Sequence, residues 1–194
     1  MVAGAKNIKG RLAFCMALFF TLTFFGQQSR WQQRVKYRMQ VELNDSLHTL
    51  TGKSEIYYIN NSPDTLRKLF FHLWPNAYRN RHTALAEQEL RSGATTLYYA
   101  GEKDLGYIDS LDFRTKGSQL RWNYDKKHID ICEIYLDAAL VPGDSVLITT
   151  PFFLKIPDAR FSRLGHTKQA YYITQWYPKP AVYDEEGWHP MPYL

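Results

Sequence analysis

The sequence has little cysteine, no low-complexity run and no large excess of one charge. Its 194 residues include two cysteines, too few for the disulfide framework of a small secreted domain. Cys15 lies in an N-terminal apolar segment, and we expect Cys132 to be a buried strand thiol. Hydrophobic residues make up 45% of the chain and aromatic residues 15%, which excludes a disordered chain. The length predicts one domain.

The N-terminal residues have the pattern of an export signal. Lys6, Lys9 and Arg11 precede an uncharged apolar run of 14 residues, 12–25. A basic stretch followed by an apolar stretch is typical of a signal peptide. The run is shorter than the roughly 20 residues that a helix needs to cross a bilayer, so a permanent span is the weaker interpretation. We predict that residues 1–29 are a signal peptide or N-terminal membrane segment. The protein is then exported, to the periplasm, the cell envelope or the exterior.

The basic excess belongs largely to this segment. Subtracting its three basic residues from the formal charge of +5 leaves 5 − 3 = +2 for the exported part. Lys and Arg are interspersed with acidic residues after that point, and no basic stripe follows the chain. We therefore expect no nucleic-acid partner, and membrane contact only through the N-terminal segment.

Alternating patterns predict a mainly β domain over residues 30–194. Apolar and polar side chains alternate along residues 35–43, as in a strand with one buried face. A second β-rich run at 49–60 follows a turn at 44–46, so the two runs should form a hairpin. Further strands are expected at 66–74, 107–113, 119–124, 128–136 and 145–153, and one short helix at 83–91. Short strands with polar turns indicate a β-sandwich or an open curved antiparallel sheet.

The last quarter of the chain has a different composition. Residues 171–194 contain five Tyr and two Trp interleaved with four prolines. Each proline removes a hydrogen-bond donor from a sheet, so this segment should be irregular, with its aromatic side chains packed. The packing of Trp176, Trp188, Tyr183 and Tyr193 is expected to be against the sheet or a missing domain. The chain stops within this segment, and we expect the domain to be incomplete at its C-terminus.

Sequence motifs for catalysis are absent. No two of the six histidines are four residues apart, which excludes H-E-x-x-H, and there is no G-x-S-x-G, Walker or G-x-G-x-x-G motif. Residues 184–186 are acidic and should form a solvated turn before Gly187. His72 lies in an apolar run and is expected to be a hydrogen-bonded or edge-facing histidine. We predict no catalytic and no metal-binding residue in this chain.

Three stretches together resemble a known family. They are GKSEIYYINNSPDTLRKLFFHLWPNA at 52–77, PFFLKIPDARFSRLG at 151–165 and ITQWYPKPAVYDEEGWHPMPY at 173–193. They are similar to the N-terminal domain of the gluzincin zinc metallo-aminopeptidases, the family of aminopeptidase N and leukotriene hydrolase, in its bacterial cell-envelope branch. The resemblance covers about residues 37–194 and implies a saddle-shaped antiparallel sheet.

This resemblance also implies a division of labour. In the family a thermolysin-like catalytic domain with H-E-x-x-H follows, so the chain looks truncated before that domain and carries one wall of the substrate cleft. Zinc is implied in the parent protein and none is expected in this chain. Whether an enzyme results is left open, because this chain lacks the zinc ligands.

A substrate-binding loop is implied as well. Many family members carry T-Q-x-(Q/E) in this domain, and its amide or carboxylate accepts hydrogen bonds from the α-ammonium of a peptide substrate. An exopeptidase must hold that cation at a fixed distance from the reacting bond, and charge-assisted acceptors do so well. Thr174 and Gln175 match the motif, so Gln175 is the candidate substrate-binding residue. Tyr177 stands at the second position, where it can accept a hydrogen bond but brings no negative charge.

Two functions of different classes remain open. The first is the non-catalytic leading domain of an exported zinc metallopeptidase that cleaves residues from peptide N-termini. The second is a free-standing β-sandwich module whose aromatic C-terminal stretch binds glycans or extended peptides.

Overall fold

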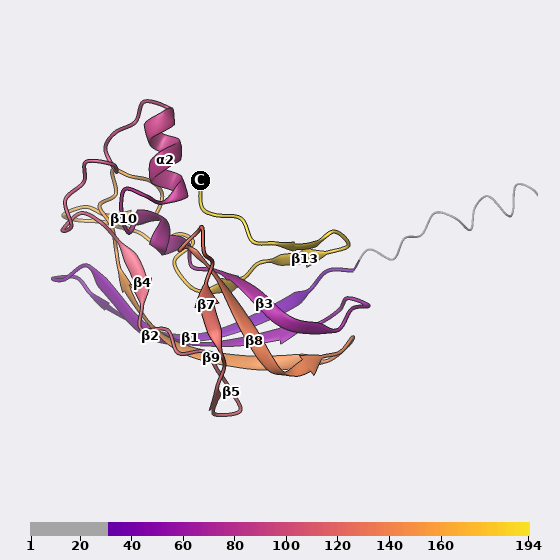
Figure 1. Ribbon diagram of the computed structural model, residues 1–194. Helices are drawn as coiled ribbons and strands as arrows, with labels where there is room; N and C mark the ends of the chain where they lie inside the picture. Colours follow the sequence, from indigo (N-terminus) through magenta and orange to yellow (C-terminus); the bar gives the residue numbers. More distant parts are fainter. Residues whose placement is uncertain (1–30) are drawn as a thin grey trace, which may run out of the picture. The chain divides into compact units, whose positions relative to one another are not determined.

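The computed structural model describes residues 31–194, and the expected export signal at 1–29 lies outside the described residues. Strands β1 (Arg34–Asn44), β2 (Thr49–Ile59) and β9 (Ser145–Lys155) form one curved antiparallel sheet (Figure 1). The predicted hairpin is confirmed, since β1 pairs with β2 along its whole length of 11 residues. The short strands β4 (Tyr107–Asp109), β5 (Arg114–Thr115) and β6 (Ser118–Gln119) extend the sheet beyond β9.

A second antiparallel sheet packs against the first. Its order is β12 (Lys179–Pro180), β3 (Leu66–His72), β8 (Ile131–Leu140) and β7 (Trp122–Tyr124). Two small hairpins complete the strands: β10 (Gly165–His166) with β11 (Tyr171–Tyr172), and β13 (Val182–Asp184) with β14 (Gly187–His189). The described part of the chain is therefore mainly β and sandwich-like, as the sequence predicts.

The core lies between the two larger sheets. Ile56 and Ile148 of the first sheet and Leu69 and Phe71 of the second are all 0% exposed and belong to one hydrophobic cluster. Cys132 on β8 belongs to the same cluster and is also 0% exposed, which confirms the predicted buried thiol. Burial raises the pKa of its thiol.

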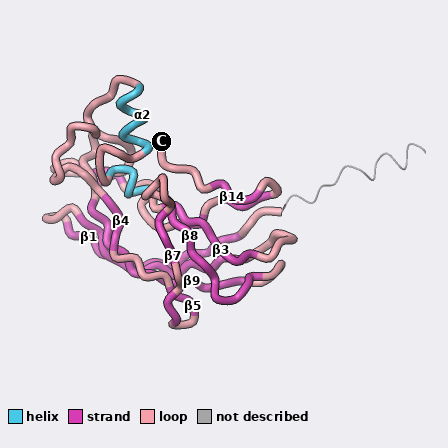
Figure 2. The backbone as a smooth tube through the Cα atoms, viewed as in Figure 1, coloured by secondary structure: helices cyan, strands magenta, loops and turns pink. Residues whose placement is uncertain are grey.

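Helical structure and long loops gather at one end of the sheets (Figure 2). The 3₁₀ helix η2 (Trp74–Tyr78) follows β3 directly, and α2 (Ala84–Arg91) confirms the predicted helix. Thr83 caps α2, because its Oγ1 accepts a hydrogen bond from the Ala86 amide at 3.3 Å and donates one to the Ala77 carbonyl at 2.6 Å. No helix among the described residues is long and apolar enough to cross a membrane.

Several predicted strands differ in extent. The strand expected at 107–113 ends at Asp109, because Ser110 has a left-handed φ of 58°. The run at 119–124 is divided between β6 and β7, and the strand from Leu66 ends at His72, before the proline-containing η2. The segment 171–194 is irregular as predicted, with no strand longer than three residues.

The turn after β2 is built around a buried asparagine. Asn60 is 0% exposed, and its amide donates to the carbonyls of Asp64 at 2.7 Å and Leu140 at 3.0 Å. Its Oδ1 accepts from the amide and the hydroxyl of Ser62, at 3.1 and 2.6 Å. The turn predicted at 60–64 is thus confirmed, and its first residue ties β2 to the end of β8.

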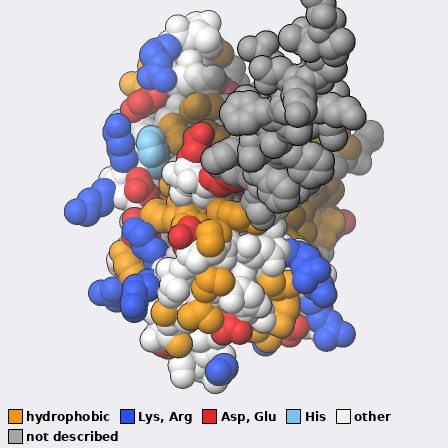
Figure 3. Space-filling view, turned by 90° about the vertical axis from the view of Figure 1, so that its right-hand side faces the viewer, with side chains coloured by type: hydrophobic (Ala, Val, Ile, Leu, Met, Phe, Trp, Pro, Cys, Tyr) orange, Lys and Arg blue, Asp and Glu red, His pale blue; other side chains and the backbone are white. Residues whose placement is uncertain are grey.

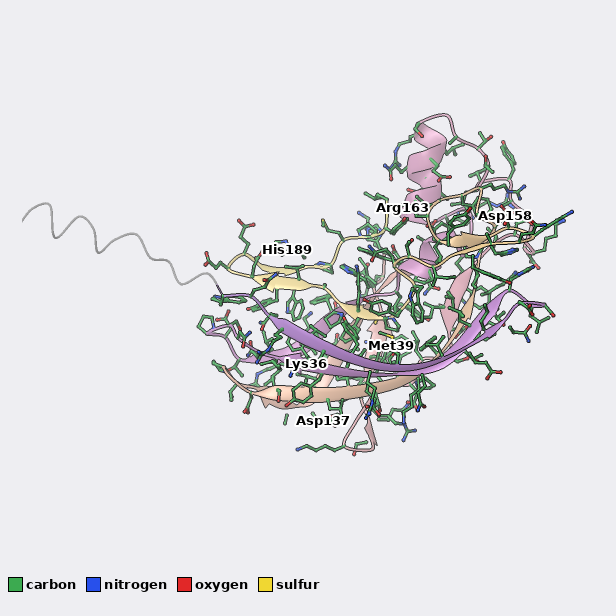
Figure 4. The ribbon with its side chains drawn as sticks, turned by 180° about the vertical axis from the view of Figure 1, so that it is seen from behind. Lys36, Met39, Asp137, Asp158, Arg163 and His189 are labelled. Carbon is green, nitrogen blue, oxygen red and sulfur yellow. The ribbon has the colours of Figure 1, made fainter. Side chains whose placement is uncertain are left out.

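The apolar face of β1 is less buried than its alternating pattern predicts. Val41 is 45% exposed and Leu43 47%, although Phe152 and Leu154, in register with them two strands away, are buried. β1 is the edge strand, and the shared core contains residues of β2 and β9 but only a partly buried Val35 from β1. Figure 3 shows one face of the molecule on which hydrophobic side chains gather between Lys and Arg side chains. Figure 4 shows β1 from behind, with Lys36 and Met39 along it.

Candidate functional site

The predicted substrate-binding residues lie in residues 174–180 (TQWYPKP), which we call the 174–180 loop. The Thr174 hydroxyl donates a hydrogen bond to the Arg163 carbonyl at 2.9 Å, which fixes the start of the loop. Its end forms β12, where Lys179 pairs with His72 and Pro180 with Phe71 of β3. The loop therefore runs from the β10–β11 hairpin to the second sheet.

Gln175 has a strained backbone and a bound cation. Its φ is 53°, a left-handed conformation that is uncommon for a side chain of this kind and often marks functional positions. Its Oε1 accepts a hydrogen bond from the Lys179 ammonium at 2.7 Å. The amide oxygen that the sequence assigns to a substrate ammonium thus already binds an ammonium of the chain itself.

Tyr177 points to a different neighbour. Its ring packs edge-on against Tyr37 of β1, with centroids 5.2 Å apart, and against Trp176 at 5.3 Å. Trp176 in turn packs against the core residue Phe152 at 5.7 Å. Among the described residues, no hydrogen bond or ring contact joins Tyr177 to Gln175. The two residues therefore share a loop but do not interact with each other.

Lys179 is held between neutral groups. Its Nζ lies 3.5 Å from the centroid of the Trp74 ring, a cation–π contact, besides its bond to Gln175. Burial lowers the pKa of Lys179 to about 8. Within residues 31–194 no carboxylate lies within ion-pair distance of it. The ammonium is positioned by an amide and an indole, and neither neutralises its charge.

The ring of His72 stacks on the Trp74 ring that Lys179 contacts. The two rings are stacked, with centroids 4.6 Å apart and planes 18° from parallel. His72 is 6% exposed, and neither ring nitrogen forms a hydrogen bond of good geometry with a described residue, although the His189 backbone lies near enough to oppose the lowering of its pKa. Burial, and next the charge of Lys179, lower the pKa of His72 to about 4. The expectation of a hydrogen-bonded or edge-facing histidine is wrong, because β3 lies between β12 and β8.

Beside the loop lies an open hollow of about 990 Å³. Arg163, Tyr172 and Thr174 are among the residues that line it, so the hollow leads to the residue before Gln175. Arg163 and Asp158 lie at the end of the molecule that carries α2 (Figure 4). The candidate binding site is the Gln175–Lys179 pair, and the hollow lies next to it along the chain without being lined by either residue.

The acidic residues 184–186 form a turn as predicted. This turn joins β13 to β14, with Gly187 at a φ of 105°. The Asp184 carboxylate accepts hydrogen bonds from the Glu186 amide at 2.9 Å and shares one with His189 at 2.7 Å.

The side chains of this domain do not fit a zinc site. Within residues 31–194, no group of three or more His, Cys, Asp or Glu side chains is arranged to hold a metal ion. We therefore derive no chemical step through a metal for this chain.

Sequence reasoning missed the cluster formed by His72, Trp74 and Lys179. The prolines on both sides of Lys179 indicate a fixed backbone. They give no sign that this segment pairs with β3, more than 100 residues earlier in the chain. His72 and Trp74 read as part of an apolar run, and only the pairing of β12 with β3 brings them to Lys179.

The fold and the site define a class of domain, a mainly β, sandwich-like domain with an amide, an ammonium and an indole gathered at one loop. No protein-family model matches the chain, and a search of curated proteins finds no match. The family resemblance of the sequence stays a prediction.

Proposed function

We propose that this chain is the non-catalytic N-terminal domain of an exported zinc metallopeptidase that removes residues from peptide N-termini. In this proposal the domain forms one wall of the substrate cleft, and a thermolysin-like domain outside the chain holds zinc and performs the hydrolysis. Export rests on the basic and apolar pattern of residues 1–29, and the family rests on the three stretches that resemble it.

One observation carries the proposal. Gln175, the residue that the motif assigns to the substrate's α-ammonium, has its Oε1 2.7 Å from an ammonium nitrogen. Its left-handed backbone belongs to a loop anchored at both ends, by the Thr174 hydroxyl and by the pairing of β12 with β3. An amide oxygen held in this way is preorganised to accept charge-assisted hydrogen bonds from a cation.

The activity itself is tested on the chain extended through its downstream domain. We expect hydrolysis of aminoacyl anilides that a chelator abolishes and added zinc restores. Hydrolysis that ignores the chelator, or none at all, would refute the proposal.

The role of Gln175 is tested in the same protein. We expect Gln175→Ala to raise KM for free-amine peptides about tenfold, since a hydrogen bond to a charged group contributes about 1.5–3 kcal/mol. The inhibition constant of N-acetylated peptides should hardly change. The matched control is Gln169→Ala, which removes an exposed amide from the nearby turn between β10 and β11. Equal effects on free and acetylated peptides would exclude ammonium recognition by Gln175.

A free-standing module that binds glycans or extended peptides is the second candidate. It is favoured by Tyr172, an aromatic side chain that lines the hollow and is 52% exposed. This function predicts that the 194-residue chain is monomeric and binds oligosaccharides or peptides alone, with Tyr172→Ala weakening that binding. Calorimetric titration of the chain with such ligands separates the two candidates.

A further inference from the structure

Lys179 places a positive charge at the position where the proposed function requires the substrate's α-ammonium to bind. A side-chain amide oxygen has two lone pairs, and Lys179 uses one of them on Gln175. The second lone pair is free to accept a hydrogen bond from a substrate's α-ammonium, but that cation would then lie close to the Lys179 cation. Two ammonium groups on one oxygen repel each other unless an anion lies next to both.

The described residues, 31–194, do not supply that anion. The polar and aromatic groups around the Lys179 ammonium are the Gln175 amide and the Trp74 indole, with a neutral His72 behind the indole. No described carboxylate forms an ion pair with it, as noted above. A half-buried cation without a counter-ion is suited to bind an anionic group of a ligand.

The position of this cation is fixed. Pro178 and Pro180 restrict the backbone on both sides of Lys179, and the Trp74 indole that it contacts donates a hydrogen bond to the Met191 carbonyl at 3.2 Å. The Lys179 side chain therefore presents its charge at one place beside Gln175. A residue that recognises a ligand by charge needs this kind of preorganisation.

We propose that Lys179 is a specificity-determining residue, which binds the side-chain carboxylate of a substrate whose first residue is Asp or Glu. This inference rests on the proposed function, in which Gln175 accepts a hydrogen bond from the α-ammonium of the same residue. In Asp and Glu the carboxylate lies one or two methylene groups from the α-carbon, so one residue can reach both Gln175 and Lys179. The substrate carboxylate then separates the two cations and neutralises the excess charge. A first residue with a neutral side chain leaves the two ammonium groups in repulsion.

The test compares glutamyl and glutaminyl anilides, which are nearly equal in shape and differ in charge. In the extended protein we expect kcat/KM to be at least about tenfold higher for the glutamyl substrate. Lys179→Met should lower kcat/KM for the glutamyl substrate about tenfold and raise it for the glutaminyl and leucyl substrates. Lys179→Arg keeps the charge and should retain the glutamyl preference. Lys126→Met, at an exposed turn, is the matched control and should change nothing.

The outcomes separate this inference from the proposed function. Zinc-dependent hydrolysis in which Lys179→Met changes both substrates equally overturns the role of Lys179 and leaves the peptidase proposal intact. If no anilide is hydrolysed, the peptidase proposal fails. The carboxylate site is then decided by NMR on the 194-residue chain, titrated with the α-amides of glutamate and glutamine. A saturable shift of the Trp74 indole resonance with the glutamate amide only, lost in Lys179→Met, supports the site; no shift, or equal shifts, overturns it.

Discussion

Asn60 shows how one side chain can connect distant parts of this fold. Its amide reaches the carbonyls of Asp64 and Leu140, and its oxygen accepts from Ser62. Asn61 is the next residue in the sequence but is exposed, and its side-chain amide donates a hydrogen bond to the Gln32 carbonyl at the surface. Two neighbours of the same type therefore differ in their contribution to stability.

We expect Asn60→Ala to lower the free energy of unfolding by about 2–4 kcal/mol, because buried carbonyls and the Ser62 hydroxyl lose their partner. Asn61→Ala, the matched control, should change it by less than about 0.5 kcal/mol. Urea denaturation followed by tryptophan fluorescence measures both. Similar values for the two variants would contradict the role of Asn60.

His72 predicts a pH dependence of stability. Its pKa is about 4 in the folded protein and 6.5 in its ordinary state, so the unfolded chain binds the proton first as the pH falls. The stability that neutral His72 provides is complete above pH 6.5 and is lost as the pH falls toward 4. The free energy of unfolding of the native chain should fall between pH 7 and pH 4.5. In His72→Phe, which keeps a ring against Trp74, we expect this fall to be smaller by about 1–2 kcal/mol. Urea denaturation at both pH values tests this, and identical losses would contradict it.

At the residue scale, the sequence predicts the burial of a residue or the position of a turn better than it predicts which side chains are in contact. The burial of Cys132 follows from its place in an apolar run, and the turn at 60–64 follows from its Asn, Pro and Asp residues. The partner of Gln175 could not be predicted, because Lys179 reaches it through a loop conformation with a left-handed residue. The burial of His72 without a hydrogen bond depends on a strand pairing that no local pattern encodes.

At the scale of elements, α2 depends on its N-cap residue, Thr83. The Thr83 hydroxyl bonds both the helix and the preceding η2 turn. We expect Thr83→Val, which keeps the shape and loses both hydrogen bonds, to destabilise the protein by about 1–2 kcal/mol. Thr96→Val at an exposed turn serves as the control. Thermal unfolding monitored by circular dichroism gives the comparison, and equal melting temperatures would show that the cap is dispensable.

Long elements were easier to predict than short ones for a physical reason. β1, β2 and β9 each pair over 11 residues, and in β2 and β9 the alternation of apolar and polar side chains also agrees with their burial. The two- and three-residue strands between 107 and 124 are defined by backbone geometry, such as the left-handed Ser110, and by pairing with β9 or β8. Period-two patterns cannot locate such breaks, because they describe side chains and not backbone angles.

At the scale of the whole molecule, the exposed apolar face of β1 should govern solubility. Val41 and Leu43 are nearly half exposed on an edge strand, an arrangement that promotes association. We expect the domain of residues 30–194 on its own to self-associate in light scattering, and Val41→Thr with Leu43→Thr to reduce this. Val141→Thr, at a residue 44% exposed just after β8, is the control. A native chain that stays monomeric at high concentration would contradict the prediction.

The pairing of β2 with β9 has a kinetic consequence. β1 and β2 are joined by a short turn, so their hairpin can form within about 1–10 μs once both strands are available. β9 begins only at residue 145, so its pairing with β2 closes a long loop. The loss of chain entropy on closing this loop precedes the stabilisation that the core contacts between β2 and β9 provide. During synthesis from the N-terminus, the inner edge of β2 therefore stays open until β9 has emerged. The pairing of β2 with β9 therefore comes well after the β1–β2 hairpin, and during that interval the open edge of β2 can pair with another chain.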